Sequence, residues 1–368
     1  MVSLMLNIRA LHVSWGKMQG VFLHRRVFTQ MKKETVTTNQ ITEGVIWKQL
    51  LLFFFPIVLG TFFQQLYNTA DTIVVGRFVS KEALAAVGGS AAQIVGLIVG
   101  FFVGLASGAS VIISQFYGAK NRVQLNRALH TAYAFSIIGS IFITVLGILI
   151  APWMLELMHT PQETMADALL YLRIYFAGII FVFIYNVGSS ILRAMGDSRR
   201  PLYYLIVCCI LNIVLDIVLV IVFHMGVAGV SIATIFSQGV SAVLITRALM
   251  HSDDLYQLEF RKIRFHKSAL ISLIWVGCPT GIQSVLYSVT NMLIQTFLNN
   301  LGTDTVAAWS AFGKIDSLYW MVNNAFGIAV TTFVGQNFGA GKYDRMKKSV
   351  RIGLCMGLCT ALTLTLIF

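Results

Sequence analysis

The chain alternates long apolar segments with short polar connections. A membrane-spanning helix needs about 20 mostly apolar residues, because the hydrocarbon core is about 30 Å thick and a helix rises about 1.5 Å per residue. Nine segments reach this length or nearly so, which predicts an all-α polytopic membrane protein with about nine transmembrane helices in this chain. These segments cover residues 47–76, 83–116, 126–151, 166–193, 202–223, 227–249, 268–298, 305–337 and 350–368.

The composition agrees with this pattern. Hydrophobic residues make up 57% of the chain and charged residues only 11%, whereas soluble domains carry about 25% charged residues. A water-soluble core of this size cannot hide that excess of apolar surface. Soluble globular, disordered and collagen-like chains are therefore excluded.

Basic residues are distributed unevenly along the chain. Lys and Arg concentrate before the first predicted span and in the even-numbered connections, and the odd-numbered connections hold only Arg77 and Lys81. This is the positive-inside pattern, which predicts a cytoplasmic N-terminus. It also accounts for the net charge of +12 without a nucleic-acid partner.

The N-terminal segment differs from the rest. It carries basic residues and no long apolar run, and Met31 opens a stretch that is typical of a short cytoplasmic start. Residues 1–30 are therefore either an upstream extension from a misassigned start or a genuine disordered tail. The predicted organisation is a cytoplasmic N-terminal tail at 1–45, an N-lobe of six transmembrane helices at 46–250, a cytoplasmic inter-lobe linker at 251–266 and a partial C-lobe of three helices at 267–368.

An internal repeat supports the two-lobe division. Matching residues are separated by 221 to 223 positions, and polar and proline residues recur in the same order. The first unit has an even number of spans, so both units start on the same side and the repeat is parallel. The matched pairs include Pro56 with Pro279, Gln115 with Gln336, and Gly118 with Gly339.

Acidic residues within the predicted spans are few, and they are functional candidates because charge is costly in a bilayer. Asp71 lies in the first span and Asp216 in the fifth, where Asn212 precedes it by one turn. Thr234 lies in the sixth span, and Asn68 lies one turn before Asp71. Counting residues from the outer ends places the three spans' polar groups at one depth, roughly 9–12 Å below the outer surface.

This group of residues predicts a coupling-ion site. Two carboxyl groups close together in a low dielectric cannot both ionise at low energetic cost, so the pair can hold a proton near neutral pH. Alternatively, carboxylate, amide and hydroxyl oxygens form a cage for a hard cation such as Na⁺. A third interpretation is that the two acids only join helices or line a wet outer mouth. The repeat shows that the fold does not require an acid, because Ile294 matches Asp71 in the second unit.

Other residues are candidates for conformational change and substrate contact. Pro56 frees a backbone carbonyl within the first span, so we expect either a bend that follows protonation of Asp71 or a static bend. Aromatic side chains can hold flat cations by cation–π contact. The candidates for a substrate cavity are Tyr67, Tyr185, Gln283, Tyr287, Lys314 and Asp316.

Several motifs occur in the right spans and in the right order for one family. The chain contains YNTADTIVVGRF, EALAAVG, ILRAMGDSRRP, NIVLD and VGQNFGAGK. In these motifs it resembles the MATE (multidrug and toxic compound extrusion) transporters, and among them the bacterial DinF-like branch. The resemblance implies twelve helices in two six-helix lobes and a rocker-switch mechanism. It also implies export of organic cations or other amphipathic compounds in exchange for H⁺ or Na⁺, with no organic cofactor.

The resemblance also assigns residues. The positions that match the family's N-lobe coupling site are Asp71, Asn212, Asp216 and Thr234. Pro56 matches the proline implicated in bending of the first helix. Some members carry a Glu in the seventh span, where this chain has PTGIQSVL with Gln283, and this departure favours coupling in the N-lobe. Spans ten to twelve would follow Phe368, so we expect the chain to be C-terminally incomplete.

Three functions other than antiport are alternatives for this sequence. A membrane-embedded enzyme is not expected, because HExxH, Walker A and GxSxG motifs do not occur in the sequence. A lipid-linked precursor flippase of the same superfamily would need a strongly basic cavity, and only Lys314 and Arg173 are available. A non-functional transporter fragment is the remaining alternative. The expected partners are an amphipathic or cationic small molecule and the lipid bilayer, with no obligate protein partner and no metal other than Na⁺.

Overall fold

The computed structural model describes residues 40–252, 256–299 and 303–367, and every regular element in these ranges is helical. This confirms the predicted all-α class. The predicted start at Met31, and with it residues 1–39 of the expected tail, lies outside the described residues. The elements are η1 (Gln40–Thr42), α2 (Ile46–Phe78), α3 (Lys81–Gly88), α4 (Ser90–Gly118), α5 (Arg122–Leu157), α6 (Gln162–Ala177), α7 (Ile179–Ala194), α8 (Arg199–Asp216), η2 (Ile217–Val222), α9 (Gly226–Met250), η3 (Phe260–Lys262), α10 (Lys267–Asn299), α11 (Thr303–Gly339) and α12 (Tyr343–Ile367).

Within the described residues, seven helices are long and apolar enough to cross a membrane, or eight if the bent pair α6 and α7 forms one span. The predicted eighth span, at residues 305–337, does form a helix, α11, but α11 is not among them. Adjacent Asn323 and Asn324 lower the mean hydropathy of its most apolar stretch. The predicted helix is therefore confirmed, but its described part is too polar to be counted among the candidate membrane spans.

The predicted span at 166–193 is not a straight helix. It divides at Gly178 into α6 and α7, which meet at an angle of 52°. A Cβ atom at Gly178 would overlap the side chain of Ile235 on α9. Glycine at this position therefore lets the bend pack against α9.

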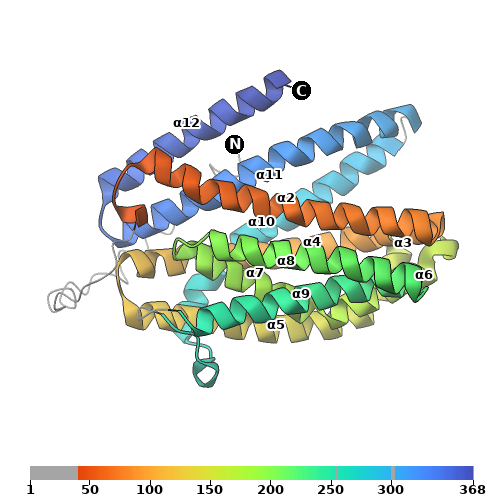
Figure 1. Ribbon diagram of the computed structural model, residues 1–368, viewed down its shortest axis with the longest axis horizontal. Helices are drawn as coiled ribbons and strands as arrows, with labels where there is room; N and C mark the ends of the chain where they lie inside the picture. Colours follow the sequence, from red (N-terminus) through yellow and green to blue (C-terminus); the bar gives the residue numbers. More distant parts are fainter. Residues whose placement is uncertain (1–39, 253–255, 300–302, 368) are drawn as a thin grey trace.

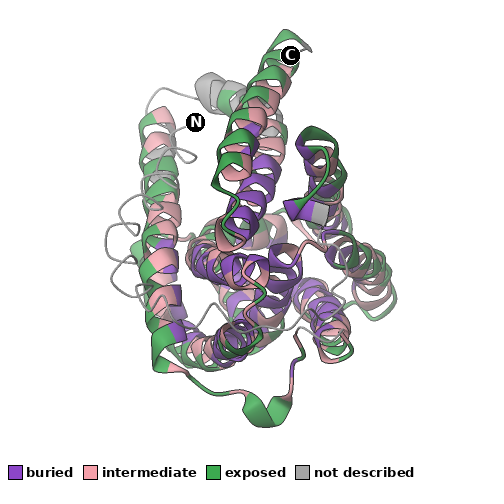
Figure 2. Ribbon diagram, turned by 90° about the vertical axis from the view of Figure 1, so that its left-hand side faces the viewer, coloured by how far each residue is buried: buried purple, intermediate pink, exposed green. Residues whose placement is uncertain are grey.

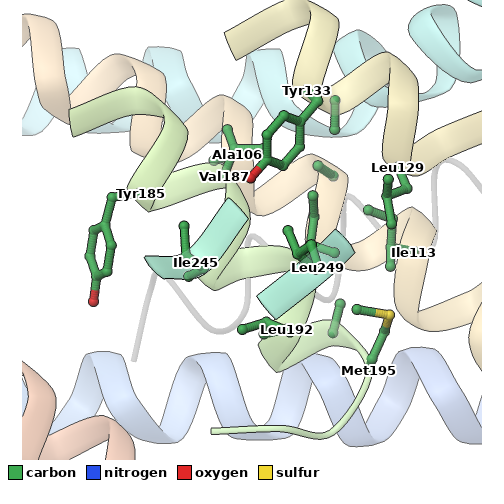
Figure 3. Close-up of a cluster of buried hydrophobic side chains, with 14 of the residues drawn as sticks. Ala106, Ile113, Leu129, Tyr133, Tyr185, Val187, Leu192, Met195, Ile245 and Leu249 are labelled. Carbon is green, nitrogen blue, oxygen red and sulfur yellow. The ribbon is translucent and has the colours of Figure 1, made fainter. Parts of the chain in front are cut away.

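Helices α2 to α9, here called the first group, run side by side as one bundle, and α10 to α12, the second group, diverge from it at their far ends (Figure 1). Figure 2 shows buried residues gathered along the centre of this arrangement. Apolar side chains from six helices of the first group, α2, α4, α5, α7, α8 and α9, fill its core, and ten of the core residues are labelled in Figure 3. One polar contact crosses that core, where the Tyr133 hydroxyl on α5 lies 3.0 Å from Thr246 Oγ1 on α9.

The two groups meet where backbones approach closely. A Cβ atom at Gly104 on α4 would lie 2.5 Å from the Cα of Gly281 on α10, and one at Gly108 would lie 2.5 Å from the amide nitrogen of Gly277. These distances leave no room for a side chain. Glycine at these positions lets α4 and α10 pack backbone to backbone.

The repeated motifs contact each other at this junction. A Cβ atom on Gly118, at the end of α4, would overlap the carbonyl oxygen of Gln336 on α11. The same contact occurs with the two repeats exchanged, because a Cβ atom on Gly339 would overlap the carbonyl oxygen of Gln115. Repeat-related residues thus occupy matching places on the two sides of one contact.

A second junction joins the start of α12 to the segment before α2. The Arg345 guanidinium donates hydrogen bonds to the carbonyl oxygens of Ile41 (3.2 Å), Glu43 (2.6 Å) and Gly44 (2.7 Å), and to Gln49 Oε1 (3.0 Å). One side chain therefore holds four acceptors from the first 50 residues. We call this set the Arg345 contact.

We expect Arg345→Ala to lower the melting temperature of the purified protein by a few degrees. Hydrogen bonds from a charged donor contribute about 1.5–3 kcal/mol, and solvent screening reduces that value at this half-buried site. Arg351→Ala, on the exposed face of the same helix, is the matched control. Equal melting temperatures for the two variants would show that the Arg345 contact does not stabilise the fold.

Candidate ion-binding site

Three helices of the first group bring polar side chains together inside the bundle. Asp71 comes from α2, Asn212 and Asp216 from α8, and Thr234 from α9. Asp71 and Asp216 lie close enough to interact directly, and Asn212 and Thr234 also lie within reach of Asp71. We call these four residues the acidic cluster.

Two adjacent polar contacts link α2 to α9. The Thr234 hydroxyl lies 3.4 Å from Asp71 Oδ2, and it also donates to the Val230 carbonyl oxygen at 3.0 Å. One turn away on both helices, Gln238 Nε2 donates to the Tyr67 hydroxyl oxygen at 3.2 Å. Because the spacing is four residues on each helix, both contacts lie on the same pair of facing surfaces.

The acidic cluster is buried and poorly satisfied. Asp216 is 0% exposed and Asn212 is 1% exposed. Within the described residues, Asp71 Oδ1, both carboxyl oxygens of Asp216 and both amide atoms of Asn212 have no hydrogen-bond partner of good geometry. Buried polar atoms are normally paired, because an unpaired one costs about 1–3 kcal/mol. The cluster therefore presents several free acceptors in one enclosed place.

The backbone after Asp216 departs from α-helical geometry. Residues Ile217–Val222 form the π-helical segment η2, and the amide of Phe223 donates to the Val218 carbonyl oxygen, five residues earlier, at 3.0 Å. Single π turns are frequent at functional sites, where they re-aim a helix. Here the wider turn begins directly after the carboxyl group.

Two tyrosines on α6 complete the surroundings. Tyr171 and Tyr175 stack with ring centroids 5.9 Å apart, and both lie close enough to Asp71 to be affected by its charge. Neither tyrosine is predicted from the sequence, and nor is Gln238, whose buried Oε1 has no partner in the described part of the chain. In a chain with 12 tyrosines, no spacing in the sequence marks these two.

Three other residues on α2 that the sequence singles out lie outside the acidic cluster. Asn68 is exposed, and its amide group lies 3.5 Å from Gln65 Oε1 rather than in the acidic cluster. Tyr67 is buried and faces α9. Pro56 lies inside α2, which continues as one helix from Ile46 to Phe78. At Pro56 the helix loses one backbone donor without ending.

The remaining substrate-cavity candidates do not form one group. Tyr185 is buried and donates to the Pro201 carbonyl oxygen at 3.2 Å. On α10, Gln283 is half-buried, and Tyr287 is exposed with its ring edge against Trp320, 5.4 Å away. Asp316 is half-buried on α11, and the side chain of Lys314 lies outside the described residues.

The described residues contain no set of three His, Cys, Asp or Glu side chains that could hold a metal ion. The acidic cluster offers two carboxyl groups, one amide and one hydroxyl group. That donor set suits a proton or a monovalent cation, since hard cations prefer oxygen ligands.

Known proteins share both the sequence and the fold. A family model described as MatE matches residues 56–218 and 279–368. The probable multidrug resistance protein YoeA of Bacillus subtilis (strain 168) is 29% identical over 334 residues, which cover 88% of this chain and 72% of that protein. The probable multidrug resistance protein YpnP of the same organism is 33% identical over 307 residues, which cover 83% of this chain and 68% of that protein.

A solved structure gives the corresponding result for the fold. It shows the outward-facing conformation of a multidrug resistance MATE family transporter of the MOP superfamily. The TM-score is 0.84 at 24% identity, and the match covers 91% of this chain and 74% of that one. At this identity the likeness concerns the fold.

We expect Asp216→Asn to leave the melting temperature unchanged or to raise it. The carboxyl oxygens of Asp216 make no hydrogen bonds of good geometry, so neutralising them removes a desolvation cost without breaking a bond. Differential scanning fluorimetry of the purified protein measures this. A fall of several degrees in the melting temperature would show instead that the Asp216 carboxyl group stabilises the packing of helices and is not an ion-binding group.

Proposed function

The chain belongs to the MatE family of multidrug efflux transporters, and from this premise we propose that it is a secondary active antiporter. It exports organic cations, drugs or other amphipathic compounds in exchange for H⁺ or Na⁺. The observation that carries this proposal is the acidic cluster, in which buried Asp216 and half-buried Asp71 hold three carboxyl oxygens without adequate partners. The proposed export moves the cargo without changing it chemically, so we assign no catalytic residue.

The acidic cluster holds the coupling ion in this proposal. If the ion is a proton, Asp71 and Asp216 share it, because two adjacent buried carboxylates repel each other. If the ion is Na⁺, the carboxyl groups, the Asn212 amide oxygen and the Thr234 hydroxyl oxygen are its ligands. In both cases the bound ion offsets the free-energy cost of burying unpaired charge. When the ion leaves, that cost returns and favours a different arrangement of α2, α8 and α9.

Transport follows from motion of two lobes. We assign the N-lobe to residues 46–250 and the partial C-lobe to 267–368, with 251–266 as the linker. In a rocker switch, the two lobes close alternately on the two sides of the membrane. The Arg345 contact and the reciprocal contacts of Gly118 and Gly339 join the lobes on the side that the distribution of basic residues assigns to the cytoplasm.

Aromatic residues beside the acidic cluster supply a cargo surface. Tyr67, Tyr171 and Tyr175 lie close enough to Asp71 to be affected by its charge, and tyrosine rings attract organic cations through their faces. Cargo and coupling ion would then compete for one negatively charged region. Bending of α2 at Pro56 is the proposed movement that links them.

The location follows from the same features. The chain is a multi-pass membrane protein by its family and its helices. We propose the bacterial plasma membrane, with the N-terminus in the cytoplasm, because the basic residues concentrate on that side.

We expect Asp71→Asn and Asp216→Asn each to reduce gradient-driven efflux to about a tenth of the wild-type rate or less, since each removes the coupling between ion and cargo. Ethidium efflux is measured in vesicles that contain the full chain, with a pH gradient or a Na⁺ gradient imposed separately. The gradient that drives wild-type efflux identifies the ion.

Asp344→Asn, in the exposed first turn of α12, is the control and retains efflux. Protein amounts are matched by immunoblot. Wild-type rates in both cluster variants would contradict the site, and wild-type vesicles that respond to neither gradient would contradict autonomous antiport.

A further inference from the structure

The connection between α9 and α10 leaves the bundle sideways. In Figure 1 the helices run horizontally, and this connection projects downward beside them rather than beyond their ends. Figure 2, which looks along the helices, shows the short helix η3 outside the outline of the bundle and coloured as exposed. A segment in this position extends in the plane of the membrane.

Three backbone amides of this connection donate hydrogen bonds to side chains near the start of α5. The amide of Gln257 donates to Asn126 Oδ1 at 3.3 Å, and the amide of Glu259 donates to His130 Nε2 at 3.1 Å. After η3, the amide of His266 donates to Thr131 Oγ1 at 3.1 Å.

Leu258 adds an apolar attachment, since it is buried in the core of the first group. The connection is therefore held on both sides of η3. Its projecting part therefore has a fixed position along the helix axes, close to the end of the bundle where α5 begins.

The projecting part combines aromatic and basic side chains. Phe260 is 59% exposed and Phe265 is 42% exposed. The cations around them are all exposed, and they are Arg261, Lys262, Arg264 and Lys267. Lys262 forms an ion pair with Glu259, which is the only acid between Tyr256 and Lys267.

This chemistry fits one location in a bilayer. Aromatic rings prefer the boundary between head groups and acyl chains, and Lys and Arg beside a membrane gain about 1 kcal/mol each from anionic lipids. A segment in water would gain nothing from two exposed phenylalanines, and a segment in hydrocarbon would not tolerate four cations.

We propose that residues 256–267 form an interfacial anchor that binds anionic lipid head groups of the cytoplasmic leaflet. Phe260 and Phe265 insert at the head-group boundary, and the four cations contact lipid phosphates. The anchor holds the connection between the two groups of helices at a fixed depth. It does not depend on the identity of the coupling ion or of the cargo.

A depth-sensitive fluorescent label tests the anchor. The five native cysteines are replaced by alanine, and bimane is attached at Phe260→Cys in the full chain. Vesicles contain phosphatidylcholine alone or with phosphatidylglycerol, and each includes a lipid that carries a quencher near its head group. We expect quenching about twofold stronger or more when phosphatidylglycerol is present.

Two comparisons make the test decisive. Bimane at Asp344→Cys, in the exposed first turn of α12, is expected to show weak quenching in both lipids. Replacing Arg261, Lys262, Arg264 and Lys267 with Gln is expected to remove the effect of phosphatidylglycerol. Quenching at position 260 that is no stronger than at 344, or that does not depend on phosphatidylglycerol, overturns the proposal even if the charge variant fails to fold.

Discussion

The arrangement of the first group depends on the cost of burying two carboxyl groups in an apolar bundle. Asp71 and Asp216 sit on different helices, yet they lie close together with few hydrogen-bond partners. Such a pair is unstable as two bare anions, because the interior offers little solvation and the charges repel. A bound proton or cation compensates that cost. In the proposed mechanism, the packing of α2, α8 and α9 is thereby linked to ion occupancy, which is the coupling that an antiporter requires.

The contacts between the two groups of helices complement this cluster. Glycine residues bring α4 against α10 and α11 at backbone distance, and the Arg345 contact ties α12 to the segment before α2. Contacts through backbone and hydrogen bonds are geometrically specific, so they favour discrete arrangements over gradual deformation. The interfacial anchor adds a third constraint, since it fixes the height of the connection around which the groups would move.

Much of this could be predicted from the sequence. Counting residues along the spans brought Asp71, Asn212, Asp216 and Thr234 to one depth, and helical spacing is regular enough to make such a count meaningful. The same count placed Asn68 with Asp71, whereas the structure leaves Asn68 exposed. A helical residue three positions from Asp71 points about 60° away from it around the helix axis, and a residue four positions away points only about 40° away. On α2 the four-residue neighbour, Tyr67, is the one that shares the buried face with Asp71. The bend at Gly178, the π-helical turn after Asp216 and the tyrosine pair on α6 depend on tertiary contacts that hydropathy does not encode.

The most direct test of the account is the number of ions that the acidic cluster binds. Potentiometric proton titration and radioactive Na⁺ binding are compared between the purified wild-type chain and the double variant Asp71→Asn/Asp216→Asn. The account predicts that the wild type binds about one more proton or one more Na⁺ per chain than the double variant. Identical proton titration and identical Na⁺ binding in the two proteins would contradict it.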